Sequence, residues 1–157
     1  MPEERLGILE QRRIEAAFAK GIYEEMKAEL GEARAKAILS RAVVKLAKQT
    51  AAEMAKEAPG GEGTLEHFIA LQPLWTKGDA LSIETLRKDA RHYDFNVTRC
   101  RYAEMYREMG LADLGAVLSC NRDGAFCEGY HPKLKLERSQ TIMGGATHCD
   151  FRYTMEE

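Results

Sequence analysis

The chain of 157 residues lacks several features that would place it in a common functional class. No segment approaches the roughly 20 apolar residues that are needed to span a bilayer, and the N-terminal segment has no secretory-signal pattern. Lysine and arginine number 23 against 25 aspartates and glutamates, so the cationic surplus of a nucleic-acid-binding protein is missing. We therefore predict a cytoplasmic protein that binds neither membrane nor nucleic acid.

Several catalytic motifs are absent as well. The sequence contains no P-loop and no dinucleotide fingerprint, which argues against phosphoryl transfer and nicotinamide chemistry, and it has no serine nucleophile elbow. Cysteine is scarce, and all four cysteines follow residue 99: Cys100, Cys120, Cys127 and Cys149. In a reducing cytoplasm such residues are used for chemistry or metal binding more often than for disulfides. The C-terminal part of the chain is therefore where we expect the functional site.

The first 57 residues have the pattern of two amphipathic helices. The first apolar stripe, at every fourth residue, contains Ile14, Phe18, Ile22, Met26 and Leu30. After Gly31, a second stripe contains Ile38, Ala42 or Val43, Leu46, Thr50 and Met54. We expect a helical hairpin whose stripes are buried within the chain or between the chains of a homo-oligomer.

The remaining residues predict short helices and two hairpins. A breaker cluster at 58–63 marks a linker, and Thr64 is placed to cap a short helix that Pro73 ends. Strands are predicted at 81–85 and 93–97 around a turn at 88–90, helices at 102–109 and 111–128, and a second hairpin at 133–142 and 147–153 around Gly144 and Gly145. Residues 1–157 are thus predicted to form one α+β domain, with an antiparallel sheet of about four strands and two helices between its hairpins.

Three groups of polar residues could carry chemistry. In the second strand one face contains His92, Asp94, Asn96, Thr98 and Cys100, and this face is either solvated or lines a wet pocket. On the predicted helix Cys120, Asp123, Gly124 and Cys127 share a face, which is either functional or merely packing. In the last hairpin a two-residue turn places Leu136, Arg138, Gln140, Cys149, Phe151 and Tyr153 inward, and Thr141, His148, Asp150 and Arg152 outward.

These groups leave two chemical interpretations open. Cys100, Cys120 and Cys149 come from separate elements and could converge on a zinc ion, although no closely spaced ligand pair supports such a site. Alternatively, one cysteine is a nucleophile that is assisted by Asp123 or by a histidine.

Three ordered segments resemble the 2-aminothiazoline-4-carboxylate hydrolase family of bacteria. The segments are DFNVTRCRYAE at 94–104, LSCNRD at 118–123, and LERSQT at 136–141 followed by Gly145 and HCDFR at 148–152. The similarity extends over about residues 60–154, and the domain region similar to these hydrolases is taken as 64–154. It implies a hydrolase that opens a small cyclic amidine or amide at a C–N bond, as in the conversion of a thiazoline amino acid towards a carbamoyl-cysteine.

The resemblance also implies the site residues. The candidate catalytic residues are Cys100, Cys120, Asp123 and Cys149, and the candidate substrate-binding residues are Asn96, Arg138, Thr141, His148 and Asp150. Cys127 is not part of the pattern and is interpreted as a packing residue. We expect a carboxylate-bearing small molecule as substrate and no cofactor, with zinc as the alternative.

Two mechanisms follow from these roles. A thiolate of Cys100 or Cys149 would attack the amidine carbon while Asp123 protonates the ring nitrogen and Arg138 binds the substrate carboxylate. Alternatively, Asp123 would act as the base for direct attack by water. A different class of function also fits the layout of helices and antiparallel sheet: a non-catalytic small-molecule or zinc-binding domain of the type found in 4-vinyl-reductase-like regulators.

Overall fold

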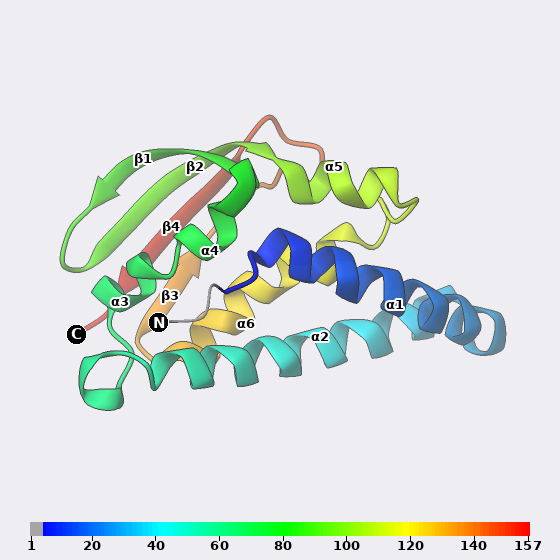
Figure 1. The fold of residues 1–157 in the computed structure, drawn as a ribbon, viewed down its shortest axis with the longest axis horizontal. Helices are drawn as coiled ribbons and strands as arrows, with labels where there is room; N and C mark the ends of the chain where they lie inside the picture. The colour runs from blue at the N-terminus through cyan, green and yellow to red at the C-terminus, as the bar shows by residue number, and fades with distance from the viewer. Residues whose placement is uncertain (1–4) are drawn as a thin grey trace.

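The computed structural model describes residues 5–157 and shows two long helices followed by a four-stranded antiparallel sheet with further helices (Figure 1). The elements are α1 (Ile8–Leu30), α2 (Glu32–Ala55), η1 (Pro59–Gly61), α3 (Leu65–Ala70), α4 (Pro73–Thr76), η2 (Lys77–Asp79), β1 (Leu81–Lys88), β2 (His92–Cys100), α5 (Arg101–Glu108), η3 (Ala116–Cys120), α6 (Asn121–Tyr130), β3 (Leu134–Glu137) and β4 (Cys149–Met155). The predicted α+β fold with two helices between its hairpins is confirmed.

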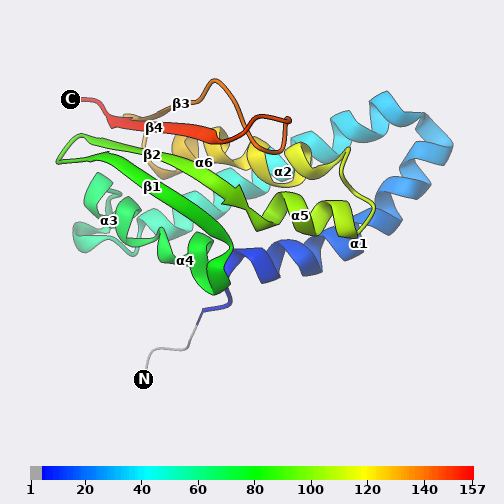
Figure 2. The same ribbon diagram turned by 90° about the horizontal axis from the view of Figure 1, so that it is seen from above.

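The sheet has the strand order β1-β2-β4-β3, so the second hairpin joins the first through β4. Helices α2, α3, α4 and α6 lie on one face of this sheet (Figure 2). Along β2, Tyr93, Phe95 and Val97 point into the core that these helices close, whereas the alternate residues remain partly or fully exposed. The alternation of apolar and polar residues therefore gave the correct inner face for most of β2.

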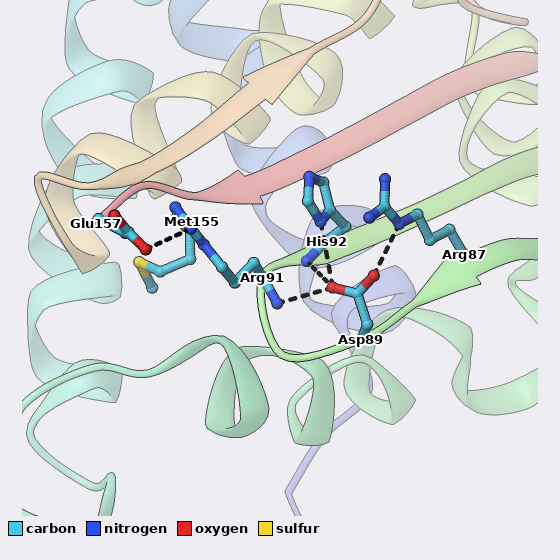
Figure 3. Close-up of polar contacts among 6 residues, drawn as sticks. All are labelled: Arg87, Asp89, Arg91, His92, Met155 and Glu157. Atoms are coloured by element: carbon cyan, nitrogen blue, oxygen red, sulfur yellow. Dashed lines mark hydrogen bonds and ion pairs between the residues drawn. The ribbon is translucent and has the colours of Figure 1, made fainter.

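The turn between β1 and β2 is fixed by one carboxylate (Figure 3). Asp89 accepts backbone N–H bonds from Arg91 and His92, both at 2.9 Å, and its other oxygen accepts from Nε of Arg87 at 2.7 Å. The backbone hydrogen bond from Arg91 is the main reason why the pKa of Asp89 is lowered. Because the Asp89 carboxylate accepts the backbone N–H groups of the turn, the predicted turn at 88–90 forms close to its expected place.

The helical hairpin forms as predicted, but only part of the predicted apolar stripes is buried: Val43 is buried, whereas Ile14, Phe18 and Leu46 are exposed. Gly31 separates α1 from α2 with a φ of +87°, a conformation that favours glycine. The buried residues of α2 are Ala35, Val43, Ala47, Ala51 and Ala55. A Cβ on Gly129 of α6 would lie 2.4 Å from the backbone oxygen of Lys48, so the backbones of α2 and α6 approach very closely. This approach selects small residues on the face of α2 that meets α6, while Leu46 and Met54 of the predicted stripe line a cavity between the helices and the sheet.

The last hairpin keeps the predicted register but opens at its end. Leu136 pairs with Tyr153, which is the pairing that a two-residue turn requires, yet the ladder between β3 and β4 stops at the pair of Glu137 and Arg152. Asp150 explains the opening, because its carboxylate accepts the backbone N–H groups of Ser139 and Gln140 at 2.9 Å. Residues 138–148 therefore form a loop instead of the predicted strands and tight turn.

Two predicted helices also differ in their ends. Thr64 caps α3 as predicted, with its hydroxyl accepting from the His67 N–H at 3.1 Å, but Pro73 begins α4 instead of only ending the preceding helix. The helix predicted from residue 111 begins later, with the π-helical turn η3 that leads into α6.

Among the described residues, no helix combines the length and apolarity that crossing a membrane requires.

Candidate active site

A cavity of about 410 Å³ lies between the helices and the inner face of the sheet. Most of its surface is apolar and comes from α1, α2, β2, β4 and α6, including Leu39, Val43, Phe95 and Phe126. Polar groups occupy a few places: the thiols of Cys100, Cys120 and Cys149, and the charged side chains of Arg12, Glu15, Arg122, Asp123 and Arg138. An apolar cavity with a small number of polar groups is the usual form of a small-molecule site.

Asp123 and Arg138 form an ion pair within this cavity. Nη1 of Arg138 donates to Oδ2 of Asp123 at 2.6 Å, and Nη2 donates to the backbone oxygen of Cys120 at 3.1 Å. The guanidinium carbon lies 5.1 Å from the ring centre of Phe151, which supports it from the sheet side. Burial raises the pKa of the Asp123 carboxyl, and the charge of Arg138 offsets part of that rise. The pair joins the first turn of α6 to the opened end of the hairpin.

Three of the four thiols line the cavity near this pair, and one of them arrives there through a β-bulge. Ile83 pairs with Val97 but Ser82 pairs with Arg99, so Thr98 is an additional residue in β2. One extra residue reverses the alternation of faces. Cys100 therefore lines the cavity together with Val97, and its predicted place on the face of Asn96 is wrong.

The thiols are held in their neutral form. Burial raises the pKa of Cys100 to about 11 and that of Cys120 to about 12. Burial also raises the pKa of Cys149, although the backbone N–H of Ile142 donates to its sulfur at 3.1 Å and opposes the rise. Cys127 packs in the core, as the sequence interpretation expected. A thiolate in the cavity would need a base that takes its proton.

The described residues contain no group of three or more histidine, cysteine, aspartate or glutamate side chains arranged to hold a metal ion. The three cavity thiols come from β2, η3 and β4, as the zinc alternative requires, but their arrangement gives that alternative no support.

The remaining predicted substrate-binding residues lie outside the cavity lining. Asn96 accepts from Nη2 of Arg152 at 3.0 Å on the outer sheet face, and Asp150 holds the backbone of the 138–148 loop. The Thr141 hydroxyl accepts the Gly144 N–H at 3.0 Å, and the His148 backbone oxygen accepts from Nε2 of Gln140 at 2.9 Å. These contacts position the loop that carries Arg138.

Sequence reasoning missed three charged residues of the cavity: Arg12, Glu15 and Arg122. A signal for Arg12 exists in the pattern of α1. Ile8, Arg12 and Ala16 are spaced by four residues, and Ile8 and Ala16 are buried. An arginine on that stripe indicates a polar environment inside the fold. The larger residues Ile14, Phe18 and Ile22 conceal this stripe when only hydrophobicity is followed.

The similar solved structures come from distant proteins. The phenol-responsive sensory domain of the transcription activator PoxR, crystallised with phenol, is similar with a TM-score of 0.53 and 16% sequence identity, over 89% of this chain and 73% of that chain. A trafficking protein particle complex subunit 3 from Naegleria fowleri, covalently bound to palmitic acid, gives a TM-score of 0.47 and 12% identity over 94% and 96%. At these identities the first likeness shows a shared fold alone, and the second supports no argument.

Comparison with families gives a more specific result. No curated protein matches this chain. The model of the L-2-amino-thiazoline-4-carboxylic acid hydrolase family matches residues 11–153, which include most of the helical hairpin, most of the sheet and all of the charged cavity residues. The chain therefore belongs to the L-2-amino-thiazoline-4-carboxylic acid hydrolase family.

Proposed function

We propose that this protein hydrolyses a small cyclic amidine or amide at a C–N bond and that the cavity is its active site. The observation that carries the proposal is the Asp123–Arg138 ion pair, 2.6 Å long, within a largely apolar cavity. Both residues lie in the segments that resemble the hydrolase family. A half-buried carboxylate beside a cation in such a cavity is typical of a site that handles protons and charges of a substrate.

The pair suits a substrate with both charges. A protonated cyclic amidine that carries a carboxylate presents one positive and one negative group. Such a molecule can exchange one internal ion pair for two: its carboxylate with Arg138, and its amidinium with Asp123. The exchange keeps the number of unpaired buried charges unchanged, which avoids the large cost of burying a lone charge.

Hydrolysis then requires one water molecule and three proton transfers. Water adds to the amidine carbon and loses a proton to Asp123, which forms a tetrahedral adduct. The bond between this carbon and the ring nitrogen breaks, its electron pair stays on the nitrogen, and Asp123 returns the proton to that nitrogen. The hydroxyl proton of the adduct passes to the resulting amine as the carbonyl group forms. The ring opens to an amine and a carbamoyl group. The raised pKa of Asp123 suits both directions of proton transfer, because a carboxyl whose pKa lies closer to neutral pH can both accept and return a proton.

Substitution of Asp123 tests this role. In the Asp123→Asn variant we expect kcat for L-2-aminothiazoline-4-carboxylate, or for the best substrate in a panel of cyclic amidines and amides, to fall at least about 100-fold. The control is Asp113→Asn, since Asp113 is exposed and lies outside the cavity lining. An Asp123→Asn variant that keeps more than about a tenth of the activity would contradict the proposal.

The reactivity of the thiols and the activity of their alanine variants distinguish attack by water from attack by a thiol. With neutral thiols, iodoacetamide should alkylate Cys100, Cys120 and Cys149 slowly at pH 7, and the rate at Cys100 should rise as the pH approaches its pKa of about 11. We also expect Cys100→Ala and Cys149→Ala to retain turnover. One thiol that reacts rapidly at pH 7, and whose alanine variant is inactive, would identify a nucleophile instead. About one zinc per chain, lost in the cysteine variants, would make the thiols a metal site.

A second candidate function is binding without catalysis. The largely apolar cavity favours it, as does the fold shared with a phenol-responsive sensory domain. Calorimetry with the same panel of cyclic amidines and amides distinguishes the two: binding of about one molecule per chain without product formation supports a ligand-binding domain. The bacterial origin and the cytoplasmic location stay predictions.

A further inference from the structure

A second charged cluster lies in the same cavity and has a different composition from the Asp123–Arg138 pair. Nη1 of Arg12 lies 3.0 Å from Oε1 of Glu15, and Nη2 of Arg122 lies 2.8 Å from Oε2 of the same carboxylate. Nε of Arg122 donates to the backbone oxygen of Leu118 at 2.7 Å. Among residues 5–157, Glu15 is the only carboxylate within ion-pair distance of either guanidinium. Two arginines from α1 and α6 therefore share one counter-charge.

This sharing leaves the cavity with surplus positive charge. Its lining contains three arginines and two carboxylates, and Asp123 is already paired with Arg138. The side chains of Arg12 and Arg122 are only 11% and 12% exposed, so water compensates little of their charge. The closeness of Arg12 adds to the effect of burial in lowering the pKa of Arg122. An uncompensated charge in such a place is costly unless a ligand supplies its partner.

The size of the cavity indicates a ligand larger than one substituted ring. Sites for drug-sized molecules have volumes of about 300–1,000 Å³, and the 410 Å³ of this cavity falls in that range. A five-membered ring with a single carboxylate fills only part of it. If such a ring engages Asp123 and Arg138, space and positive charge both remain beside Arg12 and Arg122.

We propose that Arg12 and Arg122 bind a second carboxylate of the ligand, so that the substrate is a cyclic amidine or amide with two acidic groups. The inference rests on the proposed function for the class of ring, but the anion site itself rests on the two guanidinium groups. Arginine binds carboxylates through a planar fork of donors, and two arginines on facing helices can hold one carboxylate from both sides. Glu15 occupies their donors in the free protein and moves aside for the ligand.

Matched pairs of probes test the second anion site without requiring turnover. The three benzenedicarboxylates and their monoamides differ only in whether a second carboxylate is present, and the monoamide keeps one carboxylate for Arg138. Isothermal titration of the full chain should show at least one dicarboxylate binding about tenfold more tightly than its monoamide, equivalent to about 1.4 kcal/mol. Arg12→Gln and Arg122→Gln should each remove most of that preference.

Glu15→Gln provides a test in the opposite direction. Because Glu15 competes for the same donors, the variant should bind the dicarboxylate more tightly, a gain that damage to the fold cannot produce. The control is Arg13→Gln, since Arg13 is exposed, pairs with Glu10 and lies outside the cavity lining. The inference is wrong if no dicarboxylate binds more tightly than its monoamide, or if the preference survives in both arginine variants, or if Glu15→Gln weakens binding. Failure of hydrolysis alone, with this preference intact, would count against the proposed function only.

Discussion

The two helices of the N-terminal hairpin carry similar apolar stripes in sequence but bury different kinds of residue. Helix α2 contacts the rest of the fold through alanines and a valine, against α6. Helix α1 buries Ile8, Ala16 and Tyr23, while its largest apolar side chain, Phe18, is 75% exposed. The hairpin runs alongside α6 and extends beyond the sheet (Figures 1 and 2).

The difference shows what decides which face of a helix is buried. On α2 the decisive factor is how closely a neighbouring backbone approaches, because Gly129 of α6 lies directly against Lys48. On α1 the side that carries Arg12 and Glu15 lines the cavity together with Phe18 and Ile22, although these two apolar side chains remain 75% and 46% exposed. Hydrophobicity alone therefore found part of the cavity-lining side of the hairpin but not the alanine face of α2 that is buried against α6.

The close approach of α2 and α6 gives the largest expected effect. Gly129→Val should destabilise the protein by about 3 kcal/mol, because the added Cβ would meet backbone atoms of Lys48 that cannot move independently. Gly124→Ala on the same helix is the matched control: its Cβ meets nothing within 4 Å, and alanine should stabilise α6 by about 0.5–1 kcal/mol. Urea unfolding measures both. Equal effects at the two glycines would show that α6 does not need this approach.

The alanine face of α2 gives an intermediate effect. Ala51 is fully buried in the core beside the sheet, so Ala51→Leu should cost about 1–3 kcal/mol through overpacking. Ala52 is exposed and one residue further along the same helix, so Ala52→Leu should change stability by less than about 0.5 kcal/mol. The same unfolding measurement compares them. A reversed order would mean that α2 is rotated relative to the face described here.

The exposed stripe of α1 gives the smallest effect on folding and the clearest effect on association. Phe18→Ser should change the unfolding free energy of the monomer by less than about 0.5 kcal/mol, since its side chain is largely in solvent. If the predicted homo-oligomer forms through this stripe, the same variant should shift light scattering towards the chain mass of 17.7 kDa. Wild-type protein that already has this mass at high concentration would contradict the oligomer.

Much of the fold followed from local patterns. Gly31 ends the first helix because its φ of +87° is available to glycine, and Thr64 caps α3 with its own hydroxyl. The register of β3 on β4 agrees with the predicted pairing. The opened end of that hairpin was not predictable, because it depends on Asp150 taking backbone N–H groups of the loop and on Arg138 reaching Asp123 across the cavity.

The candidate site was predictable in its residue types and only partly in its geometry. Cys100, Cys120, Asp123, Arg138 and Cys149 all line the cavity, whereas Asn96, Thr141, His148 and Asp150 do not. Cys100 is at the cavity through the bulge at Thr98, which no single-strand pattern reveals. Arg122 was missed because a surface arginine and a cavity arginine look alike in sequence, and Arg12 was missed because the larger apolar residues of α1 conceal the stripe on which it lies.

By itself, the sequence determined the order of helices and strands, the capping and turn residues, and the membership of three segments in one functional region. These depend on interactions between residues close along the chain, where side-chain type and spacing decide the outcome. Only the tertiary structure decided which helix faces are buried, where Cys100 points and which charges share the cavity. Those outcomes depend on how closely distant backbones approach and on ion pairs such as that of Arg122 with Glu15, two residues that are 107 positions apart in the chain.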